Sequence, residues 1–542
     1  ENNTDFSKWT EDQQKKFWAS YNKAAEAFVK EIVDSCIASG SNKEGDSIAA
    51  VAANYGYPDL KEDATAMDFF NAMLAHYDGS VKDMSSKESA GTPFFELMDD
   101  YNEFAVGVET GTSAPNITGI QKTGDNTFRV VATKVDAQMI YQLAISVCPL
   151  HYYGDKAQYD YANNKFGFPK GDLTLVRAKT TKPVGAGPYM FEKYENGVVT
   201  MKANPNYFLG EPKIKNLRMA YINQSDYINS IIAGTADVAN PSYTNEIADA
   251  IKKANSNGEV SGDKIYTVAV DAAGYGYVGI NSHNVSVNKE PGSEASKNLR
   301  RGFATIFSVY RDLAVSTYYG DRASVINYPI SNTSWAAPQP TDEGYEIAFS
   351  RDVNGNPIYT SGMTDEEKYA AAKKAALGFF EAAGYKVENG KIVSAPEGAK
   401  MEYIVMVPGG GTGDHPSFML MTESQKALAD IGMKLTINDL TNVADMWNKL
   451  EAGQAEIWCA AWQSTPDPDM YQIYYSDVAN GGKQPGGSND RYQIEDADLD
   501  SMIMTAREST DQEYRKTIYK ACLDKIVDWS CEVPIYQRQD VT

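Results

Sequence analysis

Residues that build metal and redox centres are scarce in this chain. Its five cysteines are scattered without a Cys-x-x-Cys pair, and its four histidines show neither a His-Glu-x-x-His nor a His-x-His spacing. This pattern argues against a zinc site and against histidine-ligated nickel, so we expect no cofactor. Most of the cysteines are expected to be buried as small apolar side chains. The spacing of Cys522 and Cys531 permits a bridge but does not indicate one.

Long apolar runs are also lacking. The longest candidate for a membrane span, residues 139–150, is interrupted by Gln142 and Ser146 and is shorter than the roughly 18 residues that a span needs. The start of the sequence has neither a secretion signal nor a lipobox cysteine. We therefore predict a soluble chain that has already lost any export signal, and whose contact with a membrane depends on a missing N-terminal lipid anchor.

Positive charge is deficient as well. Lys and Arg total 50 against 73 Asp and Glu, which gives a formal net charge of −23 and a pI near 4.7. Such a surface repels nucleic acid phosphates and anionic membranes. We expect no nucleic-acid partner, and we interpret the acidity as a means of keeping an exported protein in solution.

What the chain does have is length and tyrosine. At 542 residues it is too long for one hydrophobic core, so at least two lobes are expected. Tyrosine numbers 35, against 19 phenylalanines and 7 tryptophans. Because a tyrosine has a broad apolar face and a hydroxyl at its tip, this composition suits a cleft for an amphipathic ligand.

Periodicity separates a helical start from a mixed remainder. Apolar residues recur at helical spacing over residues 9–38 and 67–76, whereas alternation over 119–135, with a turn at Asn126, predicts strand. A helix is expected over 137–146. The C-terminal half predicts an α/β lobe, with helices over 296–315, 365–383, 415–430, 496–507 and 511–527 and strands over 402–407, 434–438 and 456–461. Arg300 and Arg301, at the start of one helix, are expected to make surface ion pairs.

Residues 183–240 are the most informative part of the chain. A Gly-Ala-Gly-Pro turn leads into a strand over 189–194, an Asn196-Gly197 hairpin turn and a second strand over 198–203. An Asn-Pro-Asn-Tyr turn, a third strand over 217–222 and a short helix ending in Ala-Gly-Thr-Ala-Asp follow. This order closely resembles the signature of the family 5 extracellular solute-binding proteins of ABC importers, the oligopeptide-, dipeptide- and nickel-binding group.

The resemblance covers roughly residues 116–540 and implies a fold. Residues 274–281 are similar to the strand by which this family enters its second lobe, and Val-Pro-Ile-Tyr-Gln-Arg-Gln at 533–539 resembles its return strand. The implied class is α/β, a bilobal periplasmic-binding-protein-like fold (type II, cluster C-like) with two mixed-sheet lobes joined by crossover strands. The expected domains are listed by residue: 1–115, helical outer part of lobe I; 116–270, lobe I core; 271–532, lobe II; 533–542, return strand toward lobe I.

Two departures from the family pattern concern the ends of the sequence. The lobe I strand and the Trp-Ser-Asp-Gly-like segment that usually begin a member are not found before Trp9, and the chain stops at Thr542, shortly after the return strand. We expect the sequence to be cut at both ends.

The loop over residues 460–471 is the predicted ligand site. It follows an apolar strand, and open α/β sheets hold ligands at the carboxyl ends of their strands. It resembles the family loop whose aspartate binds the α-ammonium group of a peptide, with Trp462 and Asp467-Pro468 matching. Thr465 stands about where that aspartate would be, and Cys459 replaces an arginine found in some members. We predict that Trp462, Thr465 and Asp467 bind ligand, with the ammonium role taken over by Asp467 or lost.

Four more residues are predicted to contact ligand. Asn240 and Ser242 follow the Ala-Asp-Val-Ala turn and match the lobe I loop that supplies polar contacts in the family. Tyr275 and Tyr277 lie where the chain crosses between the implied lobes, and we expect them to line the cleft.

Two other motifs are interpreted as structural. The Gly-rich loop over 408–414 lacks the Lys-Ser/Thr ending of a phosphate-binding loop, so it is predicted to be a tight turn near the cleft. The aspartates at 496, 498 and 500 have the spacing of a calcium loop, but Ser501 replaces its glycine. We interpret them as acids at a helix N-terminus, where the helix dipole favours them.

The predicted function is that of a solute-binding protein of an ABC importer. It would capture di- or oligopeptides, deliver them to permease subunits and catalyse no reaction, as a monomer and lipoprotein outside the cell or in the periplasm. An oligosaccharide is the alternative ligand. The alternative from another class is an extracellular hydrolase using Asp467 and Asp469, although proline-flanked acids in a polar loop give no reason for the shifted pKa that acid–base catalysis needs. A sensor or adhesion domain of the same fold is a third possibility.

Overall fold

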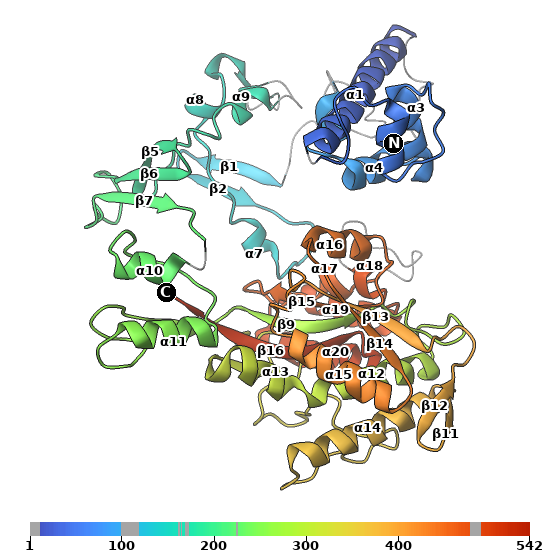
Figure 1. The fold of residues 1–542 in the computed structure, drawn as a ribbon. Coiled ribbons are helices and arrows are strands. Elements are labelled where there is room, and N and C mark those ends of the chain that lie inside the picture. Colours follow the sequence, from blue (N-terminus) through green and yellow to red (C-terminus); the bar gives the residue numbers. More distant parts are fainter. Residues whose placement is uncertain are drawn as a thin grey trace. The chain divides into compact units, whose positions relative to one another are not determined.

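The computed structural model describes residues 11–38, 40–77, 79–98, 119–160, 163, 165–168, 173–223, 226–476 and 489–542 (Figure 1). Contacts divide the chain into two compact units, one made of residues 1–131 and 146–221 and the other of residues 132–145 and 222–542. The predicted boundary between the lobes at residue 270 falls inside the second unit. The four predicted domains therefore stay a prediction.

The N-terminal part of the first unit is a group of helices, α1 (Glu11–Ala38), α2 (Ile48–Asn54), α3 (Ala66–His76), α4 (Val81–Glu88) and α5 (Phe94–Leu97). Thr65 fixes the start of α3, because its hydroxyl accepts the Asp68 N–H while the Asp68 carboxylate accepts the Thr65 N–H. Phe28, Phe70 and Phe94 pack together with ring centroids 5.2 to 6.2 Å apart. The predicted helices over 9–38 and 67–76 are confirmed within the described residues.

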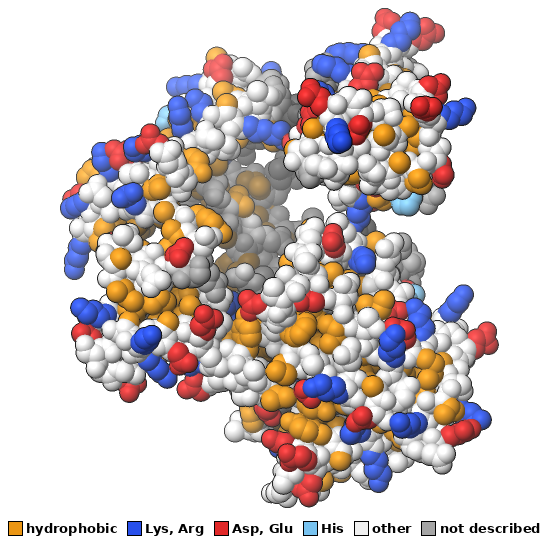
Figure 2. All heavy atoms as spheres, in the orientation of Figure 1, with side chains coloured by type: hydrophobic (Ala, Val, Ile, Leu, Met, Phe, Trp, Pro, Cys, Tyr) orange, Lys and Arg blue, Asp and Glu red, His pale blue; other side chains and the backbone are white. Residues whose placement is uncertain are grey.

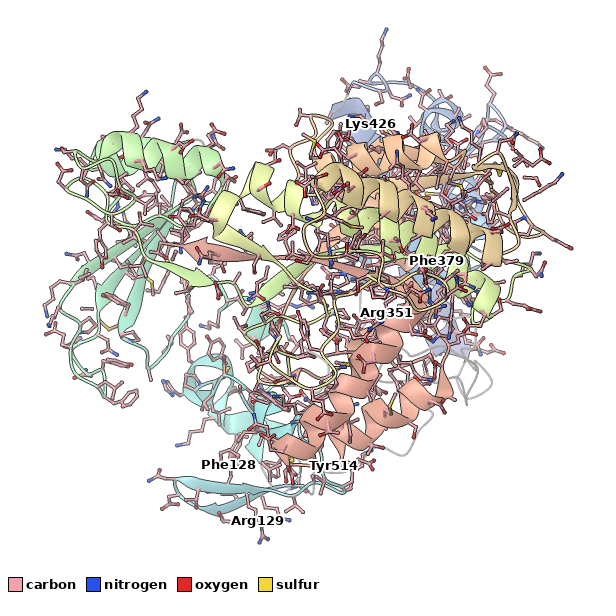
Figure 3. The ribbon with its side chains drawn as sticks, turned by 90° about the horizontal axis from the view of Figure 1, so that it is seen from below. Phe128, Arg129, Arg351, Phe379, Lys426 and Tyr514 are labelled. Atoms are coloured by element: carbon pink, nitrogen blue, oxygen red, sulfur yellow. The ribbon has the colours of Figure 1, made fainter. Side chains whose placement is uncertain are left out.

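Antiparallel strands form the rest of the first unit. Three of them, β5 (Tyr189–Glu195), β6 (Val198–Ala203) and β7 (Asn216–Ala220), make one sheet. Asn196 and Gly197 join β5 to β6 with φ of 52° and 75°, the left-handed pair that a two-residue hairpin turn requires. A separate hairpin, β1 (Ile120–Gly124) and β2 (Thr127–Val130), presents Phe128 and Arg129 (Figure 3). The predicted strands and both turns are confirmed.

Short elements connect these strands, namely α8 (Leu150–Tyr153), η2 (Lys156–Gln158), β3 (Tyr159–Asp160), β4 (Lys165–Phe166) and α9 (Thr174–Arg177). In the second unit the connecting elements include α7 (Met139–Gln142), α10 (Tyr227–Ile232), α11 (Asn245–Ala254), η5 (Gly320–Arg322), β11 (Lys386–Glu388) and β12 (Lys391–Ser394). The helix predicted over 137–146 is thus reduced to the single turn of α7.

A seven-stranded mixed sheet organises the second unit. Its order is β10 (Ala323–Val325), β16 (Glu532–Val541), β9 (Gly274–Ile280), β15 (Ile457–Gln463), β13 (Glu402–Val407) and β14 (Lys434–Asp439), with β8 (Ala269–Asp271) paired to β16. Strand β13 is parallel to β14 and β15, whereas β9 is antiparallel to β15 and β16. The carboxyl ends of β13, β14 and β15 therefore lie at the same end of the sheet.

Helices cover both faces of this sheet (Figure 1). One face packs against α12 (Glu294–Val309), α13 (Arg311–Tyr318), α14 (Asp365–Ala382) and α15 (Phe418–Asp430). The other packs against α16 (Val443–Glu451), α17 (Tyr471–Tyr474), α18 (Asn489–Tyr492), α19 (Ala497–Arg507) and α20 (Gln512–Trp529). Because side chains alternate along a strand, Val278 and Ile280 of β9 enter the first core while Tyr275 and Tyr277 enter the second.

Most predicted elements of the second unit are found, with ends within three residues of those expected. Besides the shortened helix over 137–146, the helix predicted over 296–315 differs, because it is broken at Tyr310 into α12 and α13. Asp496 caps α19 by accepting the N–H groups of Asp498 and Leu499, and Asp498 and Asp500 lie in its first turn. The interpretation of these residues as acids at a helix N-terminus is confirmed.

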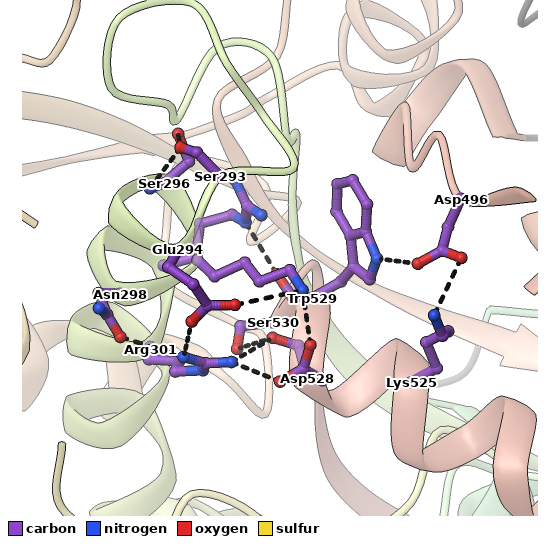
Figure 4. Close-up of polar contacts among 12 residues, drawn as sticks. Ser293, Glu294, Ser296, Asn298, Arg301, Asp496, Lys525, Asp528, Trp529 and Ser530 are labelled. Atoms are coloured by element: carbon purple, nitrogen blue, oxygen red, sulfur yellow. Dashed lines mark hydrogen bonds and ion pairs between the residues drawn. The ribbon is translucent and has the colours of Figure 1, made fainter. Parts of the chain in front are cut away.

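The expectation for Arg300 is wrong, whereas that for Arg301 is confirmed. Arg300 is fully buried and donates to the backbone carbonyls of Trp529, Val285 and Pro291 at 2.8, 3.1 and 2.9 Å. Arg301 pairs with Glu294 at 3.1 Å and with Asp528 (Figure 4). The two residues are adjacent in the helix, so their side chains lie on different faces: Arg300 on the buried face and Arg301 on the face that makes ion pairs.

The distribution of charged side chains and of cysteines can be compared with the sequence analysis. Figure 2 shows acidic and basic side chains interspersed over the face in view, rather than gathered by sign. The five cysteines, all in the described part of the chain, form no disulfide with one another; Cys36, Cys459, Cys522 and Cys531 are buried and Cys148 is exposed. The prediction of mostly buried thiols is therefore confirmed. None of the helices in the described part of the chain is long and apolar enough to cross a membrane.

Candidate functional site

The parallel strands of the second unit bring three loops together. These loops follow the carboxyl ends of β13, β14 and β15, at residues 408–417, 440–442 and 464–470. In open α/β sheets this end is where ligands bind, because the loops can diverge without disturbing the sheet. We name it the carboxyl edge.

The glycine loop after β13 is a tight turn, as predicted. Gly410, Gly411 and Gly413 have φ of 67°, 73° and 72°, which side chains rarely tolerate. The N–H of Gly413 donates to a carboxylate oxygen of Asp439 at 2.8 Å, and a Cβ on Gly409 would lie 2.6 Å from the other oxygen. The loop is therefore folded onto the end of β14.

An open cavity of about 460 Å³ lies beside this loop. It is lined by Asn438, Asp439, Leu440, Thr441, Asp445, Asn448 and Lys449. One oxygen of Asp439 is buried without a hydrogen-bond partner. Burial lowers the pKa of His415, in the same loop, to about 4, so this imidazole is neutral at physiological pH.

Trp462, at the end of β15, is part of an aromatic cluster on the face covered by α16–α20. Its ring stacks on Tyr277 with centroids 5.7 Å apart and planes at 9°. Its indole N–H points to the Tyr492 hydroxyl at 3.1 Å and to the Glu532 carboxylate at 3.4 Å. The side chain remains partly exposed. The stacking on Tyr277 and the hydrogen bonds of the indole N–H therefore hold the Trp462 ring in one orientation.

Glu532 is the buried acceptor of this cluster. Its side chain is 0% exposed and accepts hydrogen bonds from the hydroxyls of Tyr275 at 2.8 Å, Tyr474 at 2.9 Å and Tyr492. Burial raises the pKa of Glu532 to about 7, against the lowering effect of these donors. Sequence reasoning missed Glu532, although an acid inside an apolar strand such as Cys-Glu-Val-Pro-Ile was a signal.

The two predicted tyrosines are both in this cluster, but they do different things. Tyr275 donates to Glu532 and also lies 3.0 Å from the carbonyl of Pro329. Tyr277 is fully buried under Trp462, and its hydroxyl lies 3.4 Å from the indole nitrogen of Trp458. Tyr277 thus supports Trp462 directly, and Tyr275 is linked to it through Glu532. Their role in contacting ligand stays a prediction.

Asp467 and Thr465 lie in the loop after β15. The Asp467 side chain is buried, and its oxygens accept two hydrogen bonds from Arg515 at 2.8 and 2.7 Å and one from Gln138. The Thr465 hydroxyl donates to the Asp467 carbonyl at 2.6 Å. Arg515, which sequence reasoning missed, is thus the partner of the Asp467 carboxylate that was a candidate for binding the ammonium group of a peptide. The geometry favours a loop-holding role for Asp467.

Asn240 and Ser242 lie apart from the carboxyl edge along the sequence, beside the end of β16. The Asn240 amide donates to the Thr542 hydroxyl at 2.8 Å, and Ser242 forms an isolated β-bridge with Asp540. These contacts join residues 240–242 to the return strand. Whether the two side chains also meet ligand stays a prediction.

Arg491 is a cation that sequence reasoning did not identify. Its guanidinium lies over the ring of Trp462 at 5.2 Å and over that of Trp447 at 4.9 Å. It thereby adds a positive charge to the aromatic cluster at the carboxyl edge. Arg491 lies in the short helix α18, and its sequence neighbours form no motif that would have identified it as a site residue.

A second cavity in this unit, of about 610 Å³, is lined by Arg301, Arg351, Phe379, Lys520 and Asp528 among others (Figure 3). Its cations have carboxylate partners within the chain: Arg351 with Glu346 at 3.1 Å, Lys520 with Asp524 at 2.6 Å, and Arg301 with Asp528. Asp528, which lies beside Arg301 in Figure 4, also pairs with Lys297 at 2.8 Å. This cavity therefore offers a ligand no unpaired charge from these residues.

The arrangement at the carboxyl edge suits binding rather than catalysis. Both acids of the alternative hydrolase are engaged, Asp467 by Arg515 and Asp469 by Arg507 at 3.5 Å. Within the described residues no group of three or more His, Cys, Asp or Glu side chains has the geometry of a metal site. Burial raises the pKa of Asp469, for which the sequence analysis found no reason, but both acids are already paired with arginines of the same chain. The pairing favours a structural role for them.

Comparison with known proteins gives a consistent result. The model of the bacterial extracellular solute-binding proteins, family 5 (middle), matches residues 62–484. The oligopeptide-binding protein AppA of Bacillus subtilis is 21% identical over 451 residues, which cover 82% of this chain and 71% of AppA.

Solved structures share the fold at low sequence identity. The structure of AppA from Bacillus subtilis in complex with a nonapeptide has a TM-score of 0.53 and 19% identity, covering 80% of this chain and 74% of that one. NikZ from Campylobacter jejuni in complex with Ni(L-His) also has a TM-score of 0.53, at 18% identity, covering 78% of this chain and 72% of NikZ. These similarities confirm the expected bilobal binding-protein fold.

Proposed function

Because the chain belongs to the family 5 extracellular solute-binding proteins of bacteria, which serve ABC importers, we propose that it captures peptides outside the cell and delivers them to a membrane permease. The observation that carries the proposal is the aromatic cluster at the carboxyl edge, where Trp462 is fixed by Tyr277 and Glu532. An aromatic wall held in one orientation can receive many side chains, because its contacts are mainly apolar.

Peptides are the ligand class that the relatives support best. AppA of Bacillus subtilis is an oligopeptide-binding protein, and its structure holds a nonapeptide. A peptide offers regular main-chain donors and acceptors, which give affinity without requiring one side-chain sequence. NikZ holds a nickel–histidine complex, but the described residues provide no cluster of metal-binding side chains.

The mechanism would be a shift of population and not a chemical reaction. A ligand that binds the closed form of a two-lobed protein more tightly than the open form stabilises closure in proportion to that preference. We propose that the closed form is what the permease recognises. We also propose that the protein acts as a monomer at the cell surface or in the periplasm, held to the membrane by a lipid anchor outside this sequence.

Native mass spectrometry before and after mild denaturation tests the ligand class. We expect released species with the masses of peptides. A hexose-spaced series would identify an oligosaccharide instead and would overturn the peptide proposal. Trp462→Ala should lose the bound species, whereas Trp18→Ala, which removes an exposed indole from α1 of the first unit, should retain it.

A further inference from the structure

Three tyrosine hydroxyls of the N-terminal helices converge on Glu88, the last residue of α4. Tyr57 and Tyr77 donate to its Oε1 at 2.5 and 2.8 Å, and Tyr55 donates to its backbone carbonyl at 3.1 Å. Burial raises the pKa of all three phenols, that of Tyr55 to about 12. The hydroxyls therefore stay protonated at neutral pH and act as donors.

The second oxygen of Glu88 is left open. In the part of the chain that the structure describes, Oε2 accepts no hydrogen bond and no Lys, Arg or His forms an ion pair with this carboxylate. The side chain is half-buried, and Oε2 is not one of the polar atoms sealed inside the protein. A partly buried acid normally has a cationic partner, and the described chain supplies none.

An open cavity of about 540 Å³ lies at this carboxylate. Its lining includes the rings of Tyr55 and Tyr57 and a second acid, Asp59. Among the described residues that line it there is no lysine or arginine. The volume is in the range of sites for small molecules, and acids without basic neighbours give such a cavity a negative potential.

The aromatic walls are positioned by the end of α2. Gly56 has a φ of 105°, and the N–H of Tyr57 then reaches back to the Ala52 carbonyl at 2.8 Å, as in a common helix-ending motif. Tyr55 and Tyr57 can thereby pack on the same buried ring, Phe69, with centroids 6.0 and 5.7 Å away. Because these contacts already hold the walls, a ligand would not have to order them.

The combination of aromatic rings and one open carboxylate selects a kind of cation. The π-system of a tyrosine attracts positive charge, and the carboxylate adds a full negative charge. A calcium ion needs six or more oxygen ligands and a magnesium ion keeps its waters, which this lining cannot replace. An organic ammonium ion is weakly hydrated and carries apolar groups that can pack against the rings.

We propose that this cavity binds a small organic ammonium compound, with Glu88 as its counter-ion and Tyr55 and Tyr57 as its apolar walls. The site lies within residues 55–88 of the first unit. It is separate in sequence from the carboxyl edge of the second unit, and it does not depend on the capture of peptides.

A charged probe and its neutral counterpart test the proposal. The probes are choline and dimethylbutanol, in which carbon replaces the charged nitrogen at nearly the same size. Binding to the full chain is titrated by saturation-transfer NMR in a buffer of constant ionic strength. We expect choline to bind about ten-fold or more tightly than dimethylbutanol.

Variants assign the preference to the cavity. Glu88→Gln keeps an oxygen that the tyrosines can reach but removes the charge, so choline should bind no more tightly than dimethylbutanol. Tyr57→Leu keeps the carboxylate but removes one ring, and it should weaken choline binding about three-fold or more. Glu62→Gln is the matched control, because Glu62 is an exposed acid of the same unit outside the cavity lining; its affinity for choline should be unchanged. Thermal unfolding checks that each variant is folded, and Tyr57→Leu decides if Glu88→Gln is not.

The outcomes also distinguish this site from the carboxyl edge. Trp462→Ala, in the second unit, should bind choline as the unmodified protein does. Loss of choline binding in that variant would place the cation at the carboxyl edge and overturn the proposal, without bearing on peptide capture. Equal affinity for the two probes, no binding of choline, or a preference that survives in folded Glu88→Gln or Tyr57→Leu unchanged would overturn it as well.

Discussion

Asp467 and Arg515 form a two-point ion pair, with hydrogen bonds of 2.8 and 2.7 Å between side chains that are 4% and 7% exposed. The pair joins the loop after β15 to α20, so it fixes the loop that carries the predicted ligand residues. Such a buried pair adds little net stability, because burying two charges is costly. Removing one partner is nevertheless strongly destabilising, because the other charge is then buried without compensation.

Asp467→Asn should therefore destabilise the protein by about 3 to 5 kcal/mol. Urea unfolding, followed by tryptophan fluorescence, measures the change. Asp430→Asn is the control, since Asp430 pairs with Lys373 at 2.8 Å but is 63% exposed; an exposed pair of this kind is worth about 1 kcal/mol or less. Equal effects of the two substitutions would contradict the structural role given to Asp467.

The sequence predicted what depends on neighbouring residues. The hairpin at Asn196-Gly197 and the helix α14 after Thr364 follow from turn and capping chemistry within a few residues. Side-chain partners across long separations were not predictable. Arg515 lies 48 residues from Asp467, and Glu532 lies 257 residues from Tyr275. No local pattern encodes which of the many acids and bases will meet.

The site residues also differ in whether a local sequence pattern identifies them. Trp462 was identified because its strand and loop have a recognisable order, and it lies at the carboxyl edge as that order requires. Arg491 and Glu532 were missed, because their importance comes from what surrounds them: two indole rings for one and a ring of hydroxyls for the other. Burial and unpaired donors are properties of the folded chain.

Gly279 allows β9 to pass close to an indole. A Cβ at this position would lie 2.2 Å from Cε2 of Trp458, which is fully buried and cannot move aside. Gly279→Ala should lower the free energy of unfolding by about 1 to 3 kcal/mol through overpacking. Gly187→Ala, where nothing lies within 4 Å of the added carbon, should change it little. Denaturant titration of both variants makes the comparison, and equal stability would show that the β9–β15 packing is looser than described.

The thiols should differ sharply in reactivity. Burial raises the pKa of Cys459 and Cys522 to about 12 and that of Cys531 to about 11, whereas Cys148 is exposed. Because the thiolate is the reactive form, a thiol-specific reagent should label about one cysteine in the native protein and all five after unfolding in urea. Cys148→Ser should abolish the native labelling. Labelling of several thiols without denaturant would contradict the packing of β15, α20 and β16.

Glu532 should make stability depend on pH between about 4.5 and 7. Burial raises its pKa from the ordinary value of 4.5 to about 7, so across this window the folded protein holds a proton that the unfolded chain releases. The folded state then binds more protons, and the free energy of unfolding must fall as the pH rises, by about 3 kcal/mol in total. Other groups titrate in the same range, so the measurement is the difference between the unmodified protein and Glu532→Gln, by urea unfolding at intervals from pH 4.5 to 8. The variant cannot release a proton here, and the difference should change steadily across the window and level off above it. A difference that is constant with pH would mean that Glu532 is ionised in the folded protein at all these pH values, held by the Tyr275, Tyr474 and Tyr492 hydroxyls strongly enough to overcome its burial.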